Sequence, residues 1–218
     1  MMTRAMKSAF YHVAGPVMFL NGLRYRLVGA PRKGFHKVHL GPGQQKYMPG
    51  WINVDANMFT ARCDVWSDLR HALPFHDCSI DAVYSHHVIE HLPDIPTHIR
   101  DVYRCLKSGG AYRIGVPNGD TAIRKFAEGD LSWFGDWPEK RRSIGGRLNN
   151  FILCKNEHLA IMTESYLREL LEDAGFSHIA RFQAARDTGR PDLFADCLLR
   201  EAEKDFDNPR TLIIEAVK

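Results

Sequence analysis

The first quarter of the chain lacks acidic residues altogether. No aspartate or glutamate occurs among residues 1–54 of the 218, whereas the rest of the chain carries 21 basic and 26 acidic residues. A basic arm of this kind could contact a membrane surface, a nucleic acid or an anionic substrate, and a solvated arm held by its own apolar residues is the favoured interpretation. The basic residues of this stretch are Arg4, Lys7, Arg24, Arg26, Arg32, Lys33, Lys37 and Lys46.

Paired cysteines and long apolar runs are also missing. The five cysteines are Cys63, Cys78, Cys105, Cys154 and Cys197. Their odd number and the absence of a Cys-x-x-Cys pair favour free thiols, so we expect a cytoplasmic protein. The apolar stretch 9–20 is interrupted by His12, Gly15 and Pro16 and is too short to cross a bilayer as a helix. It has no small-residue cleavage site of the secretory kind, although an acid-free start also resembles a transit peptide.

Length and composition are typical of one main domain with a flank. A chain of 218 residues with 44% hydrophobic content can bury a full core. Residues 1–35 are predicted to form one or two short helices that act as a flank or lid. Residues 36–218 are predicted to form the main domain, with an insertion at about 119–157.

A strand that stops at two glycines organises the main domain. Residues 37–40 are predicted to form a buried strand ending at Gly41 and Gly43, and a second strand, 51–54, ends at Asp55. Glycine suits this turn because it adopts positive φ and leaves the main chain open to a ligand. Asp55 is placed to accept hydrogen bonds from two ribose hydroxyls. Because the two strands are so close in sequence, the crossover helix between them is expected to be truncated.

The remaining sequence alternates strands with helices. Further strands are expected at 63–65, 79–85, 111–116, 178–182 and 211–217. One helix is predicted from Val88 to Leu106 with a glycine C-cap at 107–110, and another from an N-cap at Thr163 to Ala174. Residues 187–208 are expected to form a hairpin-like excursion. Such alternation predicts the α/β class with an open parallel sheet.

These motifs resemble the class I S-adenosylmethionine-dependent methyltransferases, in a type 11-like subgroup, from about Val38 to Lys218. The shared landmarks are 41–43, 55, 73–75, 85–92, 106–110, 174–176 and 215–218. The resemblance implies a Rossmann-like, doubly wound, mostly parallel seven-stranded sheet with an antiparallel last strand, and S-adenosylmethionine as cofactor. Gln45 stands where a third glycine is usual. The cofactor-binding residues that it implies are Leu40, Gly41, Pro42, Gly43, Asp55, Asp68, Leu69, Ser85 and His86.

Histidines gather after the strand 79–85. A helix beginning there would place His87 and His91 on one face with Glu90 beside them. Glu90 and His91 could be structural, which is the favoured interpretation. Alternatively, His87, His91 or His158 could be catalytic, with an imidazole taking the acceptor's proton. A third possibility is a divalent metal held by these four residues.

The metal interpretation has its own resemblance. His87, Glu90, His91 and His158 are similar to the Glu-x-x-Glu-His plus distant His arrangement of plant small-RNA 2′-O-methyltransferases. The Glu-x-x-Glu-His portion also resembles ubiquinone-biosynthesis O-methyltransferases, and His87 in place of the first carboxylate shifts the preference from magnesium to a softer ion. The string His-x-x-Glu-His is also the signature of inverted zinc peptidases, which gives a rival class.

The insertion at about 119–157 is expected to shape the acceptor pocket, or else to be a solvated surface loop. Candidates for stacking on a ring or pairing with an anion are Trp133, Phe134, Trp137, Lys140, Arg141, Arg142 and Arg147. We therefore predict a methyltransferase acting on a small anionic or sugar-like biosynthetic acceptor, by O-methylation. The alternatives are a metal-assisted enzyme resembling RNA 2′-O-methyltransferases and a non-catalytic cofactor-binding regulator. No separate nucleic-acid module is apparent.

Overall fold

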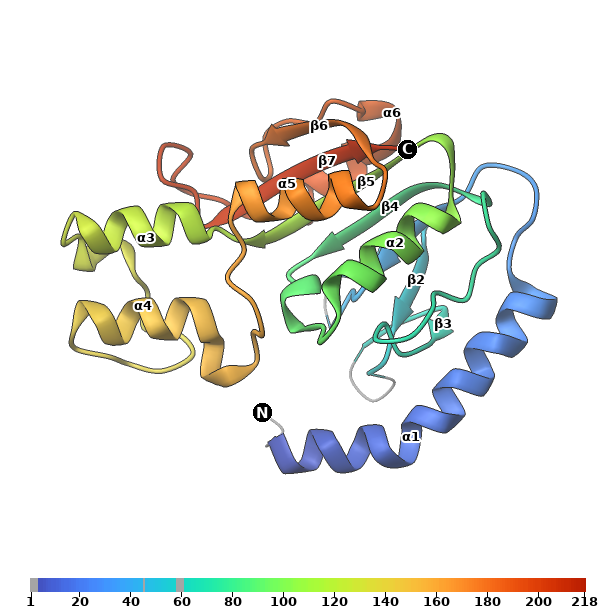
Figure 1. The fold of residues 1–218 in the computed structure, drawn as a ribbon, viewed down its shortest axis with the longest axis horizontal. Helices are drawn as coiled ribbons and strands as arrows, with labels where there is room; N and C mark the ends of the chain where they lie inside the picture. Colours follow the sequence, from blue (N-terminus) through green and yellow to red (C-terminus); the bar gives the residue numbers. More distant parts are fainter. Residues whose placement is uncertain (1–3, 45, 58–60) are drawn as a thin grey trace.

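The computed structural model describes residues 4–44, 46–57 and 61–218, so Gln45 lies outside the described residues. A seven-stranded sheet crosses the molecule in the order β3-β2-β1-β4-β5-β7-β6 (Figure 1). The strands are β1 (Lys37–Leu40), β2 (Ile52–Asp55), β3 (Val65–Trp66), β4 (Ile80–His86), β5 (Leu106–Pro117), β6 (Ser177–Phe182) and β7 (Thr211–Val217). β7 runs antiparallel to both β5 and β6, whereas the pairs among β1 to β5 are parallel. The predicted Rossmann-like α/β sheet is therefore confirmed.

Helices cover both faces of this sheet. The α-helices are α1 (Arg4–Arg24), α2 (Ile95–Cys105), α3 (Gly119–Ala127), α4 (Ile144–Leu153), α5 (Glu164–Asp173) and α6 (Pro191–Leu198). Shorter helical turns are η1 (Tyr25–Gly29), η2 (Ile89–His91), η3 (Leu131–Trp133) and η4 (Cys154–Asn156). α2 and α5 lie side by side over one face, and α6 packs on the other (Figure 1). The described residues between β1 and β2 form no helix, as the short spacing predicted.

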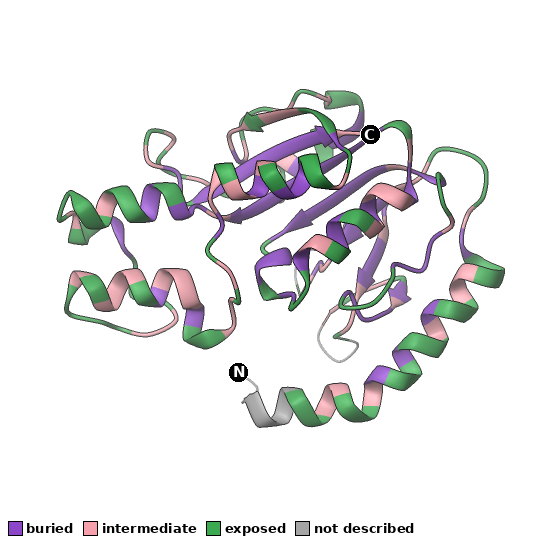
Figure 2. Cartoon of the chain, viewed as in Figure 1, coloured by how far each residue is buried: buried purple, intermediate pink, exposed green. Residues whose placement is uncertain are grey.

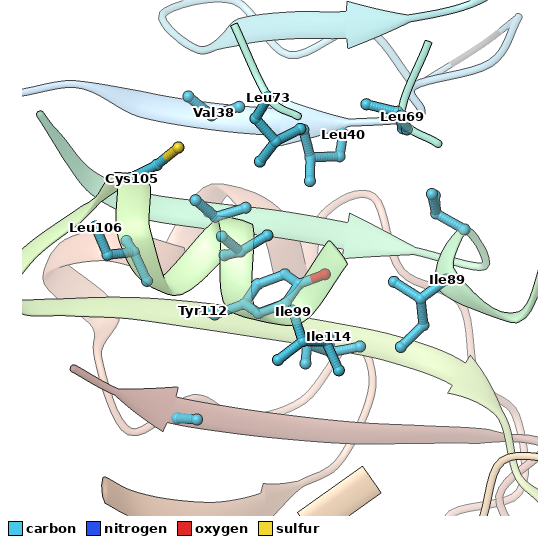
Figure 3. Close-up of a cluster of buried hydrophobic side chains, with 14 of the residues drawn as sticks. Val38, Leu40, Leu69, Leu73, Ile89, Ile99, Cys105, Leu106, Tyr112 and Ile114 are labelled. Atoms are coloured by element: carbon cyan, nitrogen blue, oxygen red, sulfur yellow. The ribbon is translucent and has the colours of Figure 1, made fainter. Parts of the chain in front are cut away.

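The core has two layers because successive strand residues point to opposite faces. Val83 joins the large cluster under α2 and α5, while its neighbour Tyr84 joins a smaller cluster with Phe194 of α6. Figure 3 shows side chains from β1, β5 and α2, including Leu40 and Ile99, meeting in the large cluster. Burial on both faces explains why the strands read as continuous apolar runs rather than alternating ones.

The predicted helix 88–106 is wrong at both ends. Leu92 precedes Pro93 and is extended, with φ −86° and ψ 137°, because the proline ring disfavours helical geometry in the residue before it. α2 starts only after Asp94, whose side chain accepts a hydrogen bond from the Thr97 backbone N–H at 3.0 Å. At the other end Leu106 is already extended and opens β5. The glycines at 109 and 110 therefore belong to the strand and form no C-cap.

The chain after β6 also departs from expectation. Residues 187–208 contain α6 rather than a hairpin-like excursion, since Pro191 opens a helix whose buried face includes Leu193 and Phe194. By contrast the N-cap of α5 is confirmed, because Thr163 accepts a hydrogen bond from the Tyr166 backbone N–H at 3.3 Å.

The insertion forms a small helical unit at the carboxyl end of β5 (Figure 1). Its core contains Trp133 and Phe134, packed with α4 residues such as Phe151. Its two ends meet: the Gly119 backbone N–H donates to the Met162 carbonyl at 2.8 Å. A Cβ on Gly119 would lie 2.5 Å from that oxygen, so glycine permits the close approach.

α1 runs along the β3 edge of the sheet (Figure 1). Met18 is fully buried, and Asn21 donates to the Trp66 carbonyl at 2.7 Å. Most of the other described side chains of α1 are exposed or half-buried, in contrast to the sheet (Figure 2). Among the described residues no helix combines the length and apolar character that a membrane crossing requires.

Candidate cofactor and acceptor site

A cavity opens where β1, β2 and β4 end. Its volume is about 660 Å³, within the usual range for small-molecule sites. The lining comes from α1, the strand ends, the loop carrying η2 and the last residues of the insertion. The carboxyl ends of parallel strands are where open α/β sheets bind ligands. The predicted residues Gly41, Asp55, Asp68 and Leu69 all line this cavity.

The glycine turn after β1 has the predicted geometry. Gly41 has φ +66°, and a Cβ there would lie 2.6 Å from Cγ2 of Val88. Gly43 has φ +57°, and its backbone N–H donates to Oδ2 of Asp55 at 3.0 Å. The other oxygen, Oδ1, accepts from the Asn57 backbone N–H at 2.8 Å. Since a carboxylate oxygen can accept two hydrogen bonds, Asp55 is fixed and each oxygen keeps one lone pair for a ligand.

Two residues of the cavity wall were missed by the sequence analysis. The Arg70 side chain donates several hydrogen bonds to the buried Asp68, among them one from Nη2 to Oδ2 at 2.6 Å. The Arg70 guanidinium in turn lies 3.6 Å from the ring centroid of Tyr11 in α1. Burial raises the pKa of Tyr11. The two-residue spacing of Asp68 and Arg70 was a usable signal, whereas the contact with α1 had none in the sequence.

Three predicted cofactor residues lie behind the strand ends. Leu40 is in the large core, and Oγ of Ser85 lies 2.8 Å from the Tyr112 hydroxyl. His86 is buried with its Nδ1 at 3.4 Å from Nζ of Lys46, and burial holds its pKa well below the ordinary value. None of these three residues is among the described residues that line the cavity, and neither are Pro42 and Gly43.

The predicted helical pairing of His87 with His91 is wrong. His87 has φ +57° and stands outside any helix, because β4 ends immediately before it. Its Nδ1 lies 3.2 Å from Oε1 of Glu90 instead, and its side chain is 39% exposed. Both His87 and His91 line the cavity.

His91 pairs with the other predicted histidine. Its ring centroid lies 4.7 Å from that of His158, and burial lowers the pKa of His158. One potential ligand atom each from Glu90, His91 and His158 lies within 4.8 Å of the other two. These three residues could hold a metal ion, whereas the fourth candidate, His87, is outside the group.

The structure of the insertion contradicts several predictions about the residues that would shape the acceptor pocket. Trp133 and Phe134 are buried in its core and cannot stack on a ligand in this arrangement, while Trp137 is 71% exposed. Arg147 pairs with Asp136 at 3.1 Å, and Arg141 pairs with Glu139, so both cations are partly neutralised. The basic residues that stay exposed beside these pairs are Lys140 and Arg142.

Comparisons with known proteins give a family match for part of the chain. Residues 54–114 match the family model described as "Methyltransferase domain". A curated protein of Mycolicibacterium smegmatis, "Probable S-adenosylmethionine-dependent methyltransferase", is 34% identical over 113 residues, covering 50% of this chain and 35% of that protein. The chain thus spans about a third of the length of this curated relative.

Solved structures show the same fold. A methyltransferase of Archaeoglobus fulgidus has a TM-score of 0.53 at 16% identity, with 96% of this chain and all of that one covered. One from Thermotoga maritima has a TM-score of 0.52 at 15% identity, covering 97% and 95%. Phosphoethanolamine N-methyltransferase 2 of Haemonchus contortus, solved with S-adenosylmethionine, has a TM-score of 0.52 at 15% identity, covering 90% and 51%.

Residues 54–114 match a methyltransferase domain, and the strand order and the glycine turn with its aspartate are similar to those of class I S-adenosylmethionine-dependent methyltransferases. This match lies within the region in which the sequence resembles the type 11-like subgroup. S-adenosylmethionine is the cofactor of this class. The bare main chain at Gly41, the anchored Asp55 carboxylate and the cavity volume fit such a ligand.

Proposed function

We propose that the protein transfers a methyl group from S-adenosylmethionine to a hydroxyl of a small anionic or sugar-like acceptor. The observation that carries this proposal is the single cavity that joins the cofactor residues Gly41 and Asp55 to His87. A donor and a proton acceptor lining one space are what an in-line methyl transfer requires.

The cofactor would be held by the main chain of 41–43 and by the carboxylate of Asp55. When bound, S-adenosylmethionine supplies the activated methyl group. Leu69 would contact the apolar side of the ligand, and Arg70 with Tyr11 would close the outer wall. In this proposal residues 1–35 serve as a lid on residues 36–218, because Ser8 and Tyr11 line the cavity from α1.

His87 is the proposed proton acceptor. If its Nδ1–H is donated to Oε1 of Glu90, 3.2 Å away, its Nε2 presents a lone pair. That nitrogen lies 3.4 Å from Oγ1 of Thr211, a long contact that an acceptor hydroxyl can replace. The neighbouring histidines, His91 and His158, are the second candidates for proton transfer.

The acceptor is proposed to bind on the insertion side. Lys155, Asn156 and Glu157 line the cavity there, and the exposed Lys140 and Arg142 could pair with a phosphate or carboxylate. A small acceptor is favoured over RNA because Trp133 and Phe134 are buried in the core of the insertion and cannot stack on bases. Among the described residues no disulfide joins two cysteines, which suits a reducing compartment such as the cytoplasm.

Two measurements test this function. Calorimetry with S-adenosylhomocysteine should show binding that Asp55→Ala weakens at least tenfold, because two hydroxyl contacts are lost. Methyl transfer from labelled S-adenosylmethionine should then be screened against phosphosugars, carboxylated sugars and short RNAs. His87→Ala should lower kcat by about 100-fold or more while cofactor affinity is kept.

The control is His178→Ala, which removes an exposed imidazole of β6 outside the cavity. Absence of any cofactor heat would overturn the proposal as a whole. Full activity of His87→Ala would remove the proposed base, and cofactor binding without turnover on any acceptor class would favour a non-catalytic regulator.

A further inference from the structure

Two distant parts of the chain are locked together beside the cavity. The Leu159 backbone N–H donates to the Glu90 carbonyl at 2.7 Å, and Nδ1 of His91 bonds the Glu157 carbonyl at 2.9 Å. These bonds join the loop after η4 to η2 and bring His158 against His91. The grouping of three possible ligand atoms within 4.8 Å is therefore held by the main chain and not by the side chains alone.

Hydrogen bonding fixes the form of both imidazoles. Nδ1 of His91 faces the Glu157 carbonyl, and Nδ1 of His158 faces the Ile152 carbonyl at 2.9 Å. A carbonyl oxygen can only accept, so each Nδ1 carries the hydrogen and each neutral ring presents a lone pair at Nε2. Metal-binding histidines are commonly oriented in this way, with the second nitrogen donating to a main-chain carbonyl.

A purely structural role for Glu90 leaves the surroundings of its carboxylate unexplained. Its side chain is 0% exposed, and Oε2 has no hydrogen-bond partner within the described part of the chain. Only Oε1 is engaged, by His87. Burying a carboxylate oxygen without a partner is costly, and a bound cation would remove that cost.

We infer that Glu90, His91 and His158 form a binding site for a divalent transition-metal ion. Two imidazoles with one carboxylate favour zinc, manganese, iron or cobalt over magnesium, which prefers oxygen ligands. Donors that share an ion at about 2 Å lie closer together than 4.8 Å, so the group contracts slightly on binding. Because the His91 side chain is exposed, its ring has room for such a shift while Nδ1 keeps its bond to the Glu157 carbonyl.

A metal ion at this site would have a role in the proposed methyl transfer. Three protein ligands leave coordination positions open, and His91 lines the cavity in which the acceptor is proposed to lie. An ion there could hold an acceptor hydroxyl and make it more acidic next to His87. This use rests on the proposed function, whereas the binding of the ion does not.

Binding is tested without any turnover. The full chain is stripped with chelator and titrated with Co²⁺ by absorbance and with Zn²⁺ by calorimetry. We expect one equivalent to bind and to raise the melting temperature. His158→Ala and Glu90→Gln should each weaken binding at least 100-fold, while His178→Ala should bind like the wild type.

Folding of each variant is checked by its heat of S-adenosylhomocysteine binding, which should stay within twofold of wild type. Since Glu90→Gln keeps the side-chain shape, it serves if His158→Ala does not fold. Wild-type protein that binds no ion, or variants that bind it with wild-type affinity, would overturn the inference. An intact metal site in a protein that transfers no methyl group counts against the proposed function alone. Turnover unchanged after stripping overturns the acceptor role of the ion.

Discussion

The cofactor region (residues 37–92) and the insertion (residues 119–157) are built on different principles. In the cofactor region the polar site is fixed by main-chain bonds, such as Gly43 N–H to Asp55, and most of its buried apolar residues belong to the large core. The insertion has a small core of its own, and its cations pair with local acids such as Asp136. The sheet therefore fixes the proposed cofactor site, whereas the proposed acceptor surface depends on a unit with local packing.

The largest effect should come from Trp133→Ala in the insertion. Trp133 packs at 4.9 Å from Phe134 and 5.0 Å from Phe151, ring centroid to ring centroid, so its loss should cost about 3–5 kcal/mol. If the core is local, proteolysis within 119–157 should accelerate while S-adenosylhomocysteine affinity stays within twofold. The matched control is the exposed Trp137→Ala, which should change neither. Equal loss of cofactor binding and insertion stability would show that the two regions are one unit.

A smaller effect is expected from Gly41→Ala in the cofactor region. Positive φ costs about 1–2 kcal/mol for alanine, and the close contact with Val88 should bring the total to about 3 kcal/mol. Melting temperature should fall, and S-adenosylhomocysteine affinity should drop at least tenfold. Gly129→Ala in the insertion shares a positive φ, +75°, but meets nothing within 4 Å. Gly129→Ala should therefore lose only the stability that positive φ costs alanine, about 1–2 kcal/mol. Equal losses of stability in the two variants would contradict the close contact of Gly41 with Val88 as a cause.

The smallest effect is the pH dependence of stability that arises from His98, the residue whose side chain bonds the Leu69 carbonyl. His98 is buried, its Nδ1 donates to the Leu69 carbonyl at 3.1 Å, and burial lowers its pKa to about 4. The unfolded chain takes up this proton near pH 6.5, before the folded chain does. The free energy of unfolding is therefore at its full value above pH 6.5. It decreases as pH falls towards 4, by about 2 kcal/mol at pH 5.

Thermal melting across this pH range provides the measurement. His98→Gln, which does not titrate, should flatten the curve in part, since burial also lowers the pKa of His39 to about 4 and that group titrates in the same direction. An unchanged curve would contradict the assignment to His98. The cofactor region should lose its ligand affinity with the same pH dependence if the Leu69 contact matters.

Local signals predicted most of the fold. The glycines after β1, the aspartate that ends β2 and the Thr163 cap are all properties of a few neighbouring residues, and all were found in the expected places. The errors arose where one residue overrides a longer pattern. Pro93 forces Leu92 out of helical geometry despite helical apolar spacing, and α6 was hidden within a polar stretch.

The candidate site was predictable only in part. Spacing along an assumed helix paired His87 with His91, but the end of β4 turns His87 towards Glu90 instead. The meeting of His91 with His158 depends on how the insertion returns to the sheet, which no local pattern encodes. The contact of Tyr11 with Arg70 was missed for the same reason, because α1 reaches Arg70 from far along the sequence.

The junction at Gly119 and Met162 has a consequence for how this scaffold can be diversified. Since the polypeptide leaves and re-enters the sheet at two hydrogen-bonded neighbours, the intervening segment could be shortened, lengthened or exchanged with little entropic penalty. New substrate preferences could therefore be grafted as a cassette onto an unchanged donor half, provided that each graft keeps Gly119 and residues 157–159, which bond η2.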